Sequence, residues 1–421
     1  MLYFFTWVML MLKIVYPVCC GVDVHKKFIV ATIATTKNNI TTYMAKKFST
    51  FSDDLLLFKQ WLSSNSCSSI CMESTGKYWI PVFNILEDTC SITLANPKYI
   101  KNIPGKKTDK RDSLWIADLH KHGLVRGSFI PPKSVRELRD LLRYRFKLVN
   151  VRSSEKNRFQ NSLTVSNIMI SNVVSDTFGK SASAIIKYAM ENPHKKNVDF
   201  SSLLHRSLLP KADVINASMK GSISQEQNSK MSVCLEHFNY IVNCIDQLDT
   251  TIDLLANNFE PQIKLVSTLP GFTTKSATSL ISEIGVDMSA FEDSKNLCSW
   301  AGVTPQNNES AGKKKSVRIS HAGVYIKPLL VQCANAAIKD KNCTYFNHRY
   351  QAIKKRRGHK RAIIAIARML LTCVYNMLKK NEAFDSSLYE GYLQNSKIQN
   401  TSGTQSSIDM QYSFFSHRDL W

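Results

Sequence analysis

Four acidic residues in the first third of the chain have the type and spacing of a metal-binding site. Asp23 lies within a strand-like run, GVDVH, and Glu73 ends another, CMESTG. Asp109 and Asp112 are three residues apart in KKTDKRDS, so they share one face if a helix starts there. Burying a carboxylate is costly unless a cation or hydrogen-bond donors satisfy it. Four oxygen ligands suit one or two Mg²⁺ ions, which can stabilise the attacking and leaving oxygens of a phosphodiester displacement.

Each of these residues also has an ordinary explanation. A single Asp in a strand is more often a turn neighbour or an ion-pair partner, and acidic residues at a helix start favour the helix dipole. The order of the predicted elements favours the metal site. Strands over CCGVDVHKK, FIVATIATT and ITTYMAKKF are followed by a helix, the strand SSICMEST, the helix KYWIPVFNILED, the strand CSITLANP and a helix from about Asp109. This is the order of a ribonuclease-H-like α/β fold, in which the first and fourth strands are neighbours and the last helix crosses their ends. All four carboxylates then converge.

Positive charge is concentrated around these carboxylates. The chain has a formal net charge of +22, and residues 98–158 hold seventeen Lys or Arg against six acidic residues. Such an excess suits a protein that lies along a phosphate backbone, because Lys and Arg displace condensed counterions. A basic protein without an anionic partner, or one bound to anionic membrane, is the alternative. We expect nucleic-acid contacts from Lys106, Lys107, Lys110 and Arg111.

A candidate nucleophile lies in a second basic region. Ser310 is followed by Ala311 and Gly312 and then by three lysines, Lys313, Lys314 and Lys315, with Arg318 nearby. Cations around a serine hydroxyl stabilise the charge that develops when it attacks phosphorus. By its spacing alone, Ser310 is more often an ordinary loop serine. The four cations are further candidates for nucleic-acid contacts.

The pattern along the chain predicts several regions. Residues 1–16 form an apolar extension, for which a start codon placed too far upstream is one explanation; no basic region precedes the apolar run, as it would in a signal peptide. An α/β domain follows over 17–133. Long amphipathic helices at 134–165 and about 233–258 predict a helical hairpin or coiled coil within 134–260, with 210–232 as a polar loop or insert. A mostly helical C-terminal domain covers 261–382, and a poorly ordered polar tail covers 383–421.

Two smaller features each allow more than one explanation. Gly271, in LPGF, could leave backbone N–H groups facing a phosphate, or it could simply precede a helix. The eleven cysteines are scattered and form no paired CxxC motifs, which favours free thiols in a reducing cytoplasm over a zinc site.

The motifs together resemble one family. The runs GVDVHKK, MESTGKYWIPVFNIL, ANPKYIKNIPGKKTDKRDSLWIADLHKHGL, SFIPP, LPGF and LCSWAGVTPQNNESAGKKKS are similar to the DEDD transposases of bacterial insertion sequences (the one-hundred-and-ten group), to which the Piv-type DNA invertases are related. The resemblance covers about residues 17–380.

The resemblance implies a RuvC-like N-terminal domain whose Asp-Glu-Asp-Asp set is Asp23, Glu73, Asp109 and Asp112, with Mg²⁺ as cofactor. It also implies a C-terminal transposase domain with Ser310 as nucleophile. Family members excise and insert their element through a covalent serine–DNA intermediate. Some use a structured RNA from the element as a guide to double-stranded DNA at the element ends and the target. They form homo-oligomers, from dimer to tetramer, and act in the bacterial cytoplasm on the nucleoid.

Two other functions remain possible on the residues alone. A RuvC-like nuclease would cut DNA with a metal-activated water and leave Ser310 idle. A non-catalytic nucleic-acid-binding regulator would use the same basic surfaces. The carboxylates argue against the regulator, since acidic groups beside a phosphate weaken simple binding.

Overall fold

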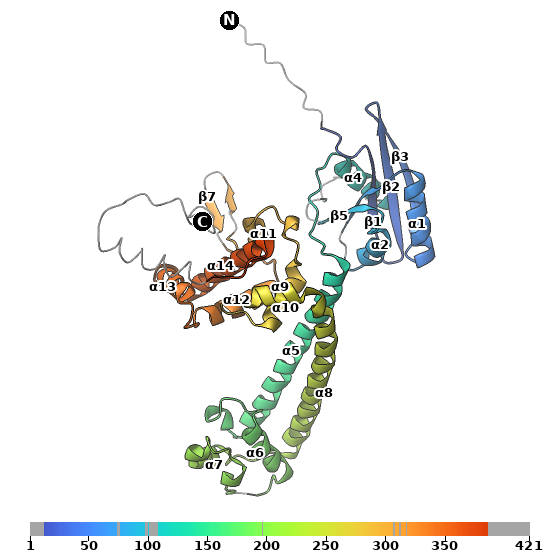
Figure 1. Ribbon diagram of the computed structural model, residues 1–421. Helices are drawn as coiled ribbons and strands as arrows, with labels where there is room; N and C mark the ends of the chain where they lie inside the picture. Colours follow the sequence, from blue (N-terminus) through green and yellow to red (C-terminus); the bar gives the residue numbers. More distant parts are fainter. Residues whose placement is uncertain are drawn as a thin grey trace, which may run out of the picture. The chain divides into compact units, whose positions relative to one another are not determined.

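The computed structural model describes residues 12–73, 76–96, 100, 108–195, 197–305, 308–310, 313–316 and 318–385, with the backbone alone at 308–310 and 313–316 (Figure 1). The chain divides between Ile130 and Pro131 into two compact units. Most of the predicted apolar extension, and all but the first residues of the predicted tail, lie outside the described residues.

A mixed five-stranded sheet forms the centre of the first unit. The strands β1 (Val18–Val24), β2 (Phe28–Lys37) and β3 (Ile40–Ser49) are antiparallel. β4 (Ser69–Glu73) runs parallel to β1, and β5 (Ser91–Ala95) runs parallel to β4, so the order across the sheet is β3-β2-β1-β4-β5. The α/β class and the five strands are confirmed.

Helices cover both faces of this sheet, as Figure 1 shows. One face packs on α1 (Ser52–Ser64) and α2 (Trp79–Leu86), and the other on α4 (Asp109–Lys121). Alternation along the strands supplies both cores, because successive side chains point to opposite faces. The α1 and α2 core contains, among others, Cys20, Val22, Ile70, Met72, Leu55, Phe58, Leu62, Val82 and Leu86.

Two long helices begin the second unit. α5 (Lys133–Val165) and α8 (Gln225–Ala256) pack antiparallel along their lengths. Arg145 of α5 forms an ion pair with Asp249 of α8, and further along Glu155 contacts His237 at 3.0 Å. Both predicted helices are confirmed, and α8 begins already at Gln225.

Residues 210–232 do not form the predicted loop, whereas their alternative assignment as an insert stays a prediction. This stretch, expected to be a loop or insert, contains α7 (Ala212–Ser218) and the first turns of α8. Ile215, Met219, Ile223 and Met231 are buried there, in a small core shared with α6 (Lys180–Glu191). Four apolar residues spread among many polar ones are enough to fix these short elements, because α6 and the end of α5 supply the rest of the core.

The remaining helices surround α14 (His359–Lys380), which lies against α9, α11, α12 and α13. Among the described helices α14 alone is long and apolar enough to cross a membrane, and most of it is buried inside the protein, as in a core helix. The bounds are α9 Glu260–Ser267, α10 Thr274–Ile284, α11 Ser294–Trp300, α12 Ile326–Ala337 and α13 Tyr345–Arg357. Short 3₁₀ turns lie at Ile170–Asn172, Ser201–Leu203, Leu209–Lys211, Asn257–Phe259 and Met288–Ala290.

Gly271 has a packing role between these helices. Its φ is +86°, and a Cβ there would lie 2.3 Å from the carbonyl oxygen of Cys333 in α12. The start of α10 is closed by a capping box between Thr273 and Ser276. These contacts favour the ordinary explanation of the glycine over a phosphate contact.

Candidate active site

Asp23 lies near the end of β1, on the face that α4 covers. The thiol of Cys19 lies 3.5 Å from the carbonyl oxygen of Ala117. Two residues further along β1, a Cβ on Gly21 would come within 2.3 Å of the Ser113 carbonyl oxygen. Moving along β1 from Cys19 therefore means moving toward the start of α4. Asp23 is the next residue on this face, and it is only 8% exposed.

Glu73 is level with Asp23 on the neighbouring strand. Gly21 pairs with Cys71 and Val22 with Met72 in the parallel β1–β4 ladder. The same register, one residue further, sets Glu73 beside Asp23. Cys71 packs against Ile116 of α4, so Glu73, two residues later, is on the α4 face as well. The two strand-end carboxylates thus share one face and one edge of the sheet.

The other two carboxylates stand in the first turn of α4. Thr108 caps this helix by accepting a hydrogen bond from the Arg111 backbone N–H. The helix N-terminus favours negative charge, so the fold tolerates Asp109 and Asp112 there. The Asp109 side chain is about half exposed, at 49%, whereas Asp112 is partly buried.

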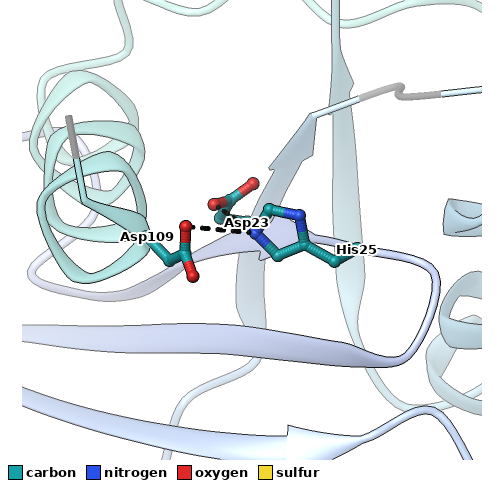
Figure 2. Close-up of side chains that lie close together, drawn as sticks. All are labelled: Asp23, His25 and Asp109. Carbon is teal, nitrogen blue, oxygen red and sulfur yellow. Dashed lines mark ion pairs between the residues drawn. The ribbon is translucent and has the colours of Figure 1, made fainter.

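His25 also belongs to this group, although it was not among the residues predicted from the sequence. Its Nε2 lies 3.1 Å from Oδ2 of Asp23 and 3.4 Å from Oδ1 of Asp109 (Figure 2). One ligand atom from each of the three residues lies within 4.8 Å of the others. A signal was present, because His25 follows Asp23 by two residues and the strand alternation that turns Asp23 toward α4 turns His25 the same way.

The electrostatics of the group show crowding of negative charge. Burial raises the pKa of Asp23, and the nearby Asp112 and Asp109 raise it further, while His25 opposes the shift. Carboxylates held together against burial and mutual repulsion are typical of sites that bind a cation.

Ser310 lies in the second unit, at the end of a β-hairpin. β6 (Asn308–Ser310) pairs antiparallel with β7 (Lys313–Ser316), and Ser310 pairs with Lys313. At the base of this hairpin, a bridge joins Pro305 to Ile319. The described part of the predicted Gly- and Lys-rich loop, Lys313–Ser316, is therefore the return strand of this hairpin, and Ala311 and Gly312 lie outside the described residues.

Two glycines and a lysine hold the base of this hairpin. A Cβ on Gly323, whose φ is +72°, would lie 2.0 Å from the Ala301 carbonyl oxygen, and one on Gly302 would lie 2.6 Å from the Ala322 carbonyl oxygen. Lys327 donates a hydrogen bond of 2.6 Å to the Ser320 carbonyl oxygen. Burial lowers the pKa of Lys327. The two chain segments that carry β6 and β7 are thus fixed closely against each other where they leave the helical core.

The candidate nucleic-acid residues fall into three groups. Lys110, Arg111 and Arg318 are exposed. Lys313, Lys314 and Lys315 are on β7, and Lys106 and Lys107 lie outside the described residues.

A further basic surface lies where α13 meets α14. It consists of Lys354, Lys355, Arg356, Arg357, His359, Lys360 and Arg361, all exposed. Within the described part of the chain, none of these side chains pairs with a carboxylate. We call this the α13–α14 basic surface.

Comparison with known proteins agrees with this arrangement. A DEDD transposase model matches residues 20–168, which include the four carboxylates. A second model, described as the transposase IS116/IS110/IS902 family, matches residues 263–351, which include Ser310. The chain belongs to this transposase family.

Individual relatives agree with the family models. The pilin gene-inverting protein of Moraxella bovis is 30% identical over 157 residues, 35% of this chain and 47% of that protein. The pilin gene-inverting protein of Moraxella lacunata is 28% identical over 158 residues, 36% of this chain and 44% of that protein. The transposase for insertion sequence element IS1111A of Coxiella burnetii is 26% identical over 157 residues, 34% of this chain and 43% of that protein. These alignments therefore span less than half of each relative.

Proposed function

We propose that this protein is a transposase or site-specific recombinase that excises and inserts an insertion sequence by cleaving and rejoining DNA strands. The observation that carries the proposal is the closeness of Asp23, near the end of β1, to Asp109 and Asp112 at the start of α4, with Glu73 ending the strand that neighbours β1. Relatives named for pilin gene inversion and for transposition support the same class of reaction.

The arrangement of the first unit supports a RuvC-like, ribonuclease-H-like fold. Three antiparallel strands are followed by two strands parallel to the first, and a helix crosses the end of β1. In this fold the ends of the central strands carry the metal ligands. Strand order supports the assignment independently of the carboxylates, because it depends on backbone pairing alone.

The residues fit a divalent metal. Their ligand atoms are mostly carboxylate oxygens. Burial, together with the nearby Asp112 and Asp109, raises the pKa of Asp23, and a cation among the carboxylates offsets these effects. We propose that Asp23, Glu73, Asp109 and Asp112 hold the metal. Bound there, a divalent ion stabilises the charge on the attacking and leaving oxygens of a phosphodiester.

We propose Ser310 as the nucleophile. Its Oγ attacks phosphorus and loses its proton, and the bond from phosphorus to a deoxyribose oxygen breaks, leaving a free sugar hydroxyl. The new phosphoserine bond keeps the phosphodiester energy, so a sugar hydroxyl of another strand can attack phosphorus and release Ser310. A hairpin end suits this task because a nucleophile there can reach a duplex, and its cross-strand neighbour Lys313 adds positive charge.

Nucleic acid is the proposed partner. Double-stranded DNA at the element ends and the target would contact Lys110, Arg111 and Arg318, together with the basic residues of β7. Following the family resemblance, we further propose a structured guide RNA, assembly as a dimer or tetramer, and action in the cytoplasm on the nucleoid.

A suicide DNA substrate tests the nucleophile. Full-length protein with a divalent metal and any required RNA should give a denaturant-stable protein–DNA adduct, and Ser310→Ala should abolish it. Ser316→Ala, on the return strand of the same hairpin, is the matched control and should keep the adduct. If Ser310→Ala cleaves DNA at the normal rate but forms no adduct and does not rejoin the strands, the nucleophile is water and the reaction is that of a metal-dependent nuclease. If Ser310→Ala still forms the adduct and rejoins DNA, another residue is the nucleophile.

A further inference from the structure

His25 has an unusual environment for a histidine at the surface of a sheet. Its side chain is 39% exposed, yet its Nε2 is shielded from solvent. The nitrogen lies near two carboxylate oxygens, but neither contact has the alignment of a hydrogen bond among the described residues. A buried polar atom without a hydrogen bond needs an explanation.

The ring is held in this position from two sides. The backbone N–H of His25 donates to the Phe28 carbonyl oxygen at 2.9 Å, in the turn between β1 and β2. The Phe28 ring packs on the imidazole with centroids 4.7 Å apart, and the Lys47 ammonium lies over the Phe28 ring, 3.6 Å from its centroid. The turn and this stack fix the direction of Nε2, so its place between the carboxylates is built into the fold.

The distances match those between ligands of one ion. Neighbouring ligands in an octahedron of radius about 2.1 Å are about 3 Å apart. The Nε2 atom is 3.1 Å from the Asp23 oxygen and 3.4 Å from the Asp109 oxygen. One cation can therefore take a nitrogen and two oxygens from this group, and it would also satisfy the Nε2 lone pair.

We propose that His25 is a metal ligand, so that the site binds a divalent first-row transition-metal ion in preference to Mg²⁺. This inference rests on the proposed metal site and deepens it. Mg²⁺ prefers hard oxygen ligands. An imidazole nitrogen instead favours first-row transition-metal ions, and the affinity of a site for these ions increases from Mn²⁺ toward Cu²⁺. The sequence predicted Mg²⁺ because the four carboxylates offer only oxygen ligands, and His25 was not among them.

Electron paramagnetic resonance of bound Mn²⁺ tests the inference without any cleavage assay. Full-length protein with Mn²⁺ at substoichiometric concentration should show hyperfine coupling to one imidazole nitrogen. His25→Ala should remove this coupling and weaken Mn²⁺ binding by roughly tenfold or more, while Mg²⁺ binding changes little. His122→Ala is the matched control. It lies at the other end of α4 from Asp109, about 20 Å away, and should change neither.

Asp23→Asn distinguishes failure of the His25 ligand from failure of the whole metal site. If Mn²⁺ binding depends on Asp23 but shows no nitrogen coupling, the role of His25 is refuted while the carboxylate site stands. Nitrogen coupling that persists in His25→Ala would assign another histidine and would refute the inference too. If Asp23→Asn leaves Mn²⁺ binding unchanged, the metal site itself is wrong, and with it the role of His25.

Discussion

Replacing Asp23 by Asn should stabilise the metal-free protein. The side chain is 8% exposed, and burial, followed by Asp112 and Asp109, raises its pKa. An acid whose pKa is raised on folding destabilises the fold above that pKa, and the penalty disappears as the pH falls through it. Asn has nearly the same shape and no charge. We therefore expect about 1 kcal/mol more unfolding free energy at neutral pH, or about 4 °C in Tm for a unit of this size.

A divalent metal should cancel this advantage. An ion that binds only the folded protein adds RT ln(1 + [metal]/Kd), which is about 1.4 kcal/mol when the metal is at ten times Kd. The wild type gains this amount, whereas Asp23→Asn has lost a ligand and gains much less. The order of the two stabilities should therefore even out or reverse when metal replaces a chelator.

Differential scanning calorimetry of both proteins, with chelator and with Mg²⁺ or Mn²⁺, measures this change of order. Asp118→Asn on the same helix is the control with the opposite sign. Burial raises the pKa of Asp118, but hydrogen bonds from Lys121 (2.7 Å) and Tyr43 (2.6 Å) lower it overall. Its replacement should destabilise the protein equally with and without metal.

Two outcomes would contradict the proposed state of Asp23, that of a destabilised carboxylate and metal ligand. One is a lower Tm for Asp23→Asn in chelator, which would mean that its charge is already balanced by His25 in the metal-free state. The other is equal stabilisation of mutant and wild type by metal, which would mean that Asp23 is no ligand. In a cleavage assay, Asp23→Asn should lose strand cleavage and retain DNA binding.

Two further predictions concern the pH dependence of stability and the basic surface. Burial lowers the pKa of His120 to about 4, so the folded state keeps it neutral, and about 3 kcal/mol of unfolding free energy should be lost as the pH falls from 6.5 toward 4. Urea unfolding across this range should show the loss, and His120→Gln should flatten it; an unchanged slope in the mutant would assign the loss to other groups. Changing Lys355, Arg356 and Lys360 of the α13–α14 basic surface to Gln should weaken DNA binding and reduce the log–log salt slope by about 0.9 for each phosphate that these side chains neutralise. Fluorescence anisotropy at several salt concentrations measures this, and an unchanged slope would exclude the surface from the DNA interface.

Much of the first unit could be predicted because its elements have clear periodicity. Short β-branched runs separated by polar turns specify the strands, and the apolar stripes of α1 and α4 specify the helices. The joint placement of Asp23 and Glu73 followed from the order of elements, since parallel neighbours end at the same edge. In the first unit the local sequence pattern and the strand topology agree, so both could be predicted from one sequence.

Other features depend on contacts that a single sequence does not display. The helices at 210–232 are fixed by a small core in which Ile215 and Met231 meet α6, and the polar residues between them hide the pattern. The two-residue spacing of His25 from Asp23 predicts that both side chains share a face, but the contacts of β1 are needed to show that this face is the one α4 covers. The hairpin that carries Ser310 depends on the close approach of two backbone segments at Gly323. The periodicity of the sequence does not predict this contact.

The packing of α4 on β1 explains how a group of like charges persists at the end of a sheet. Repulsion among Asp23, Asp109 and Asp112 would push the helix start away from the strand. Further along, the absence of a side chain at Gly21 lets the α4 backbone touch β1, and a buried hydrogen bond of 2.7 Å joins Ser113 to Thr32 of β2. These contacts fix α4 against the sheet beyond the turn that carries the acidic residues. The helix start therefore cannot move away to separate the charges. Uptake of a proton, which the raised pKa of Asp23 favours, or binding of a cation can still relieve the repulsion, and this arrangement suits the proposed metal ion before the ion binds.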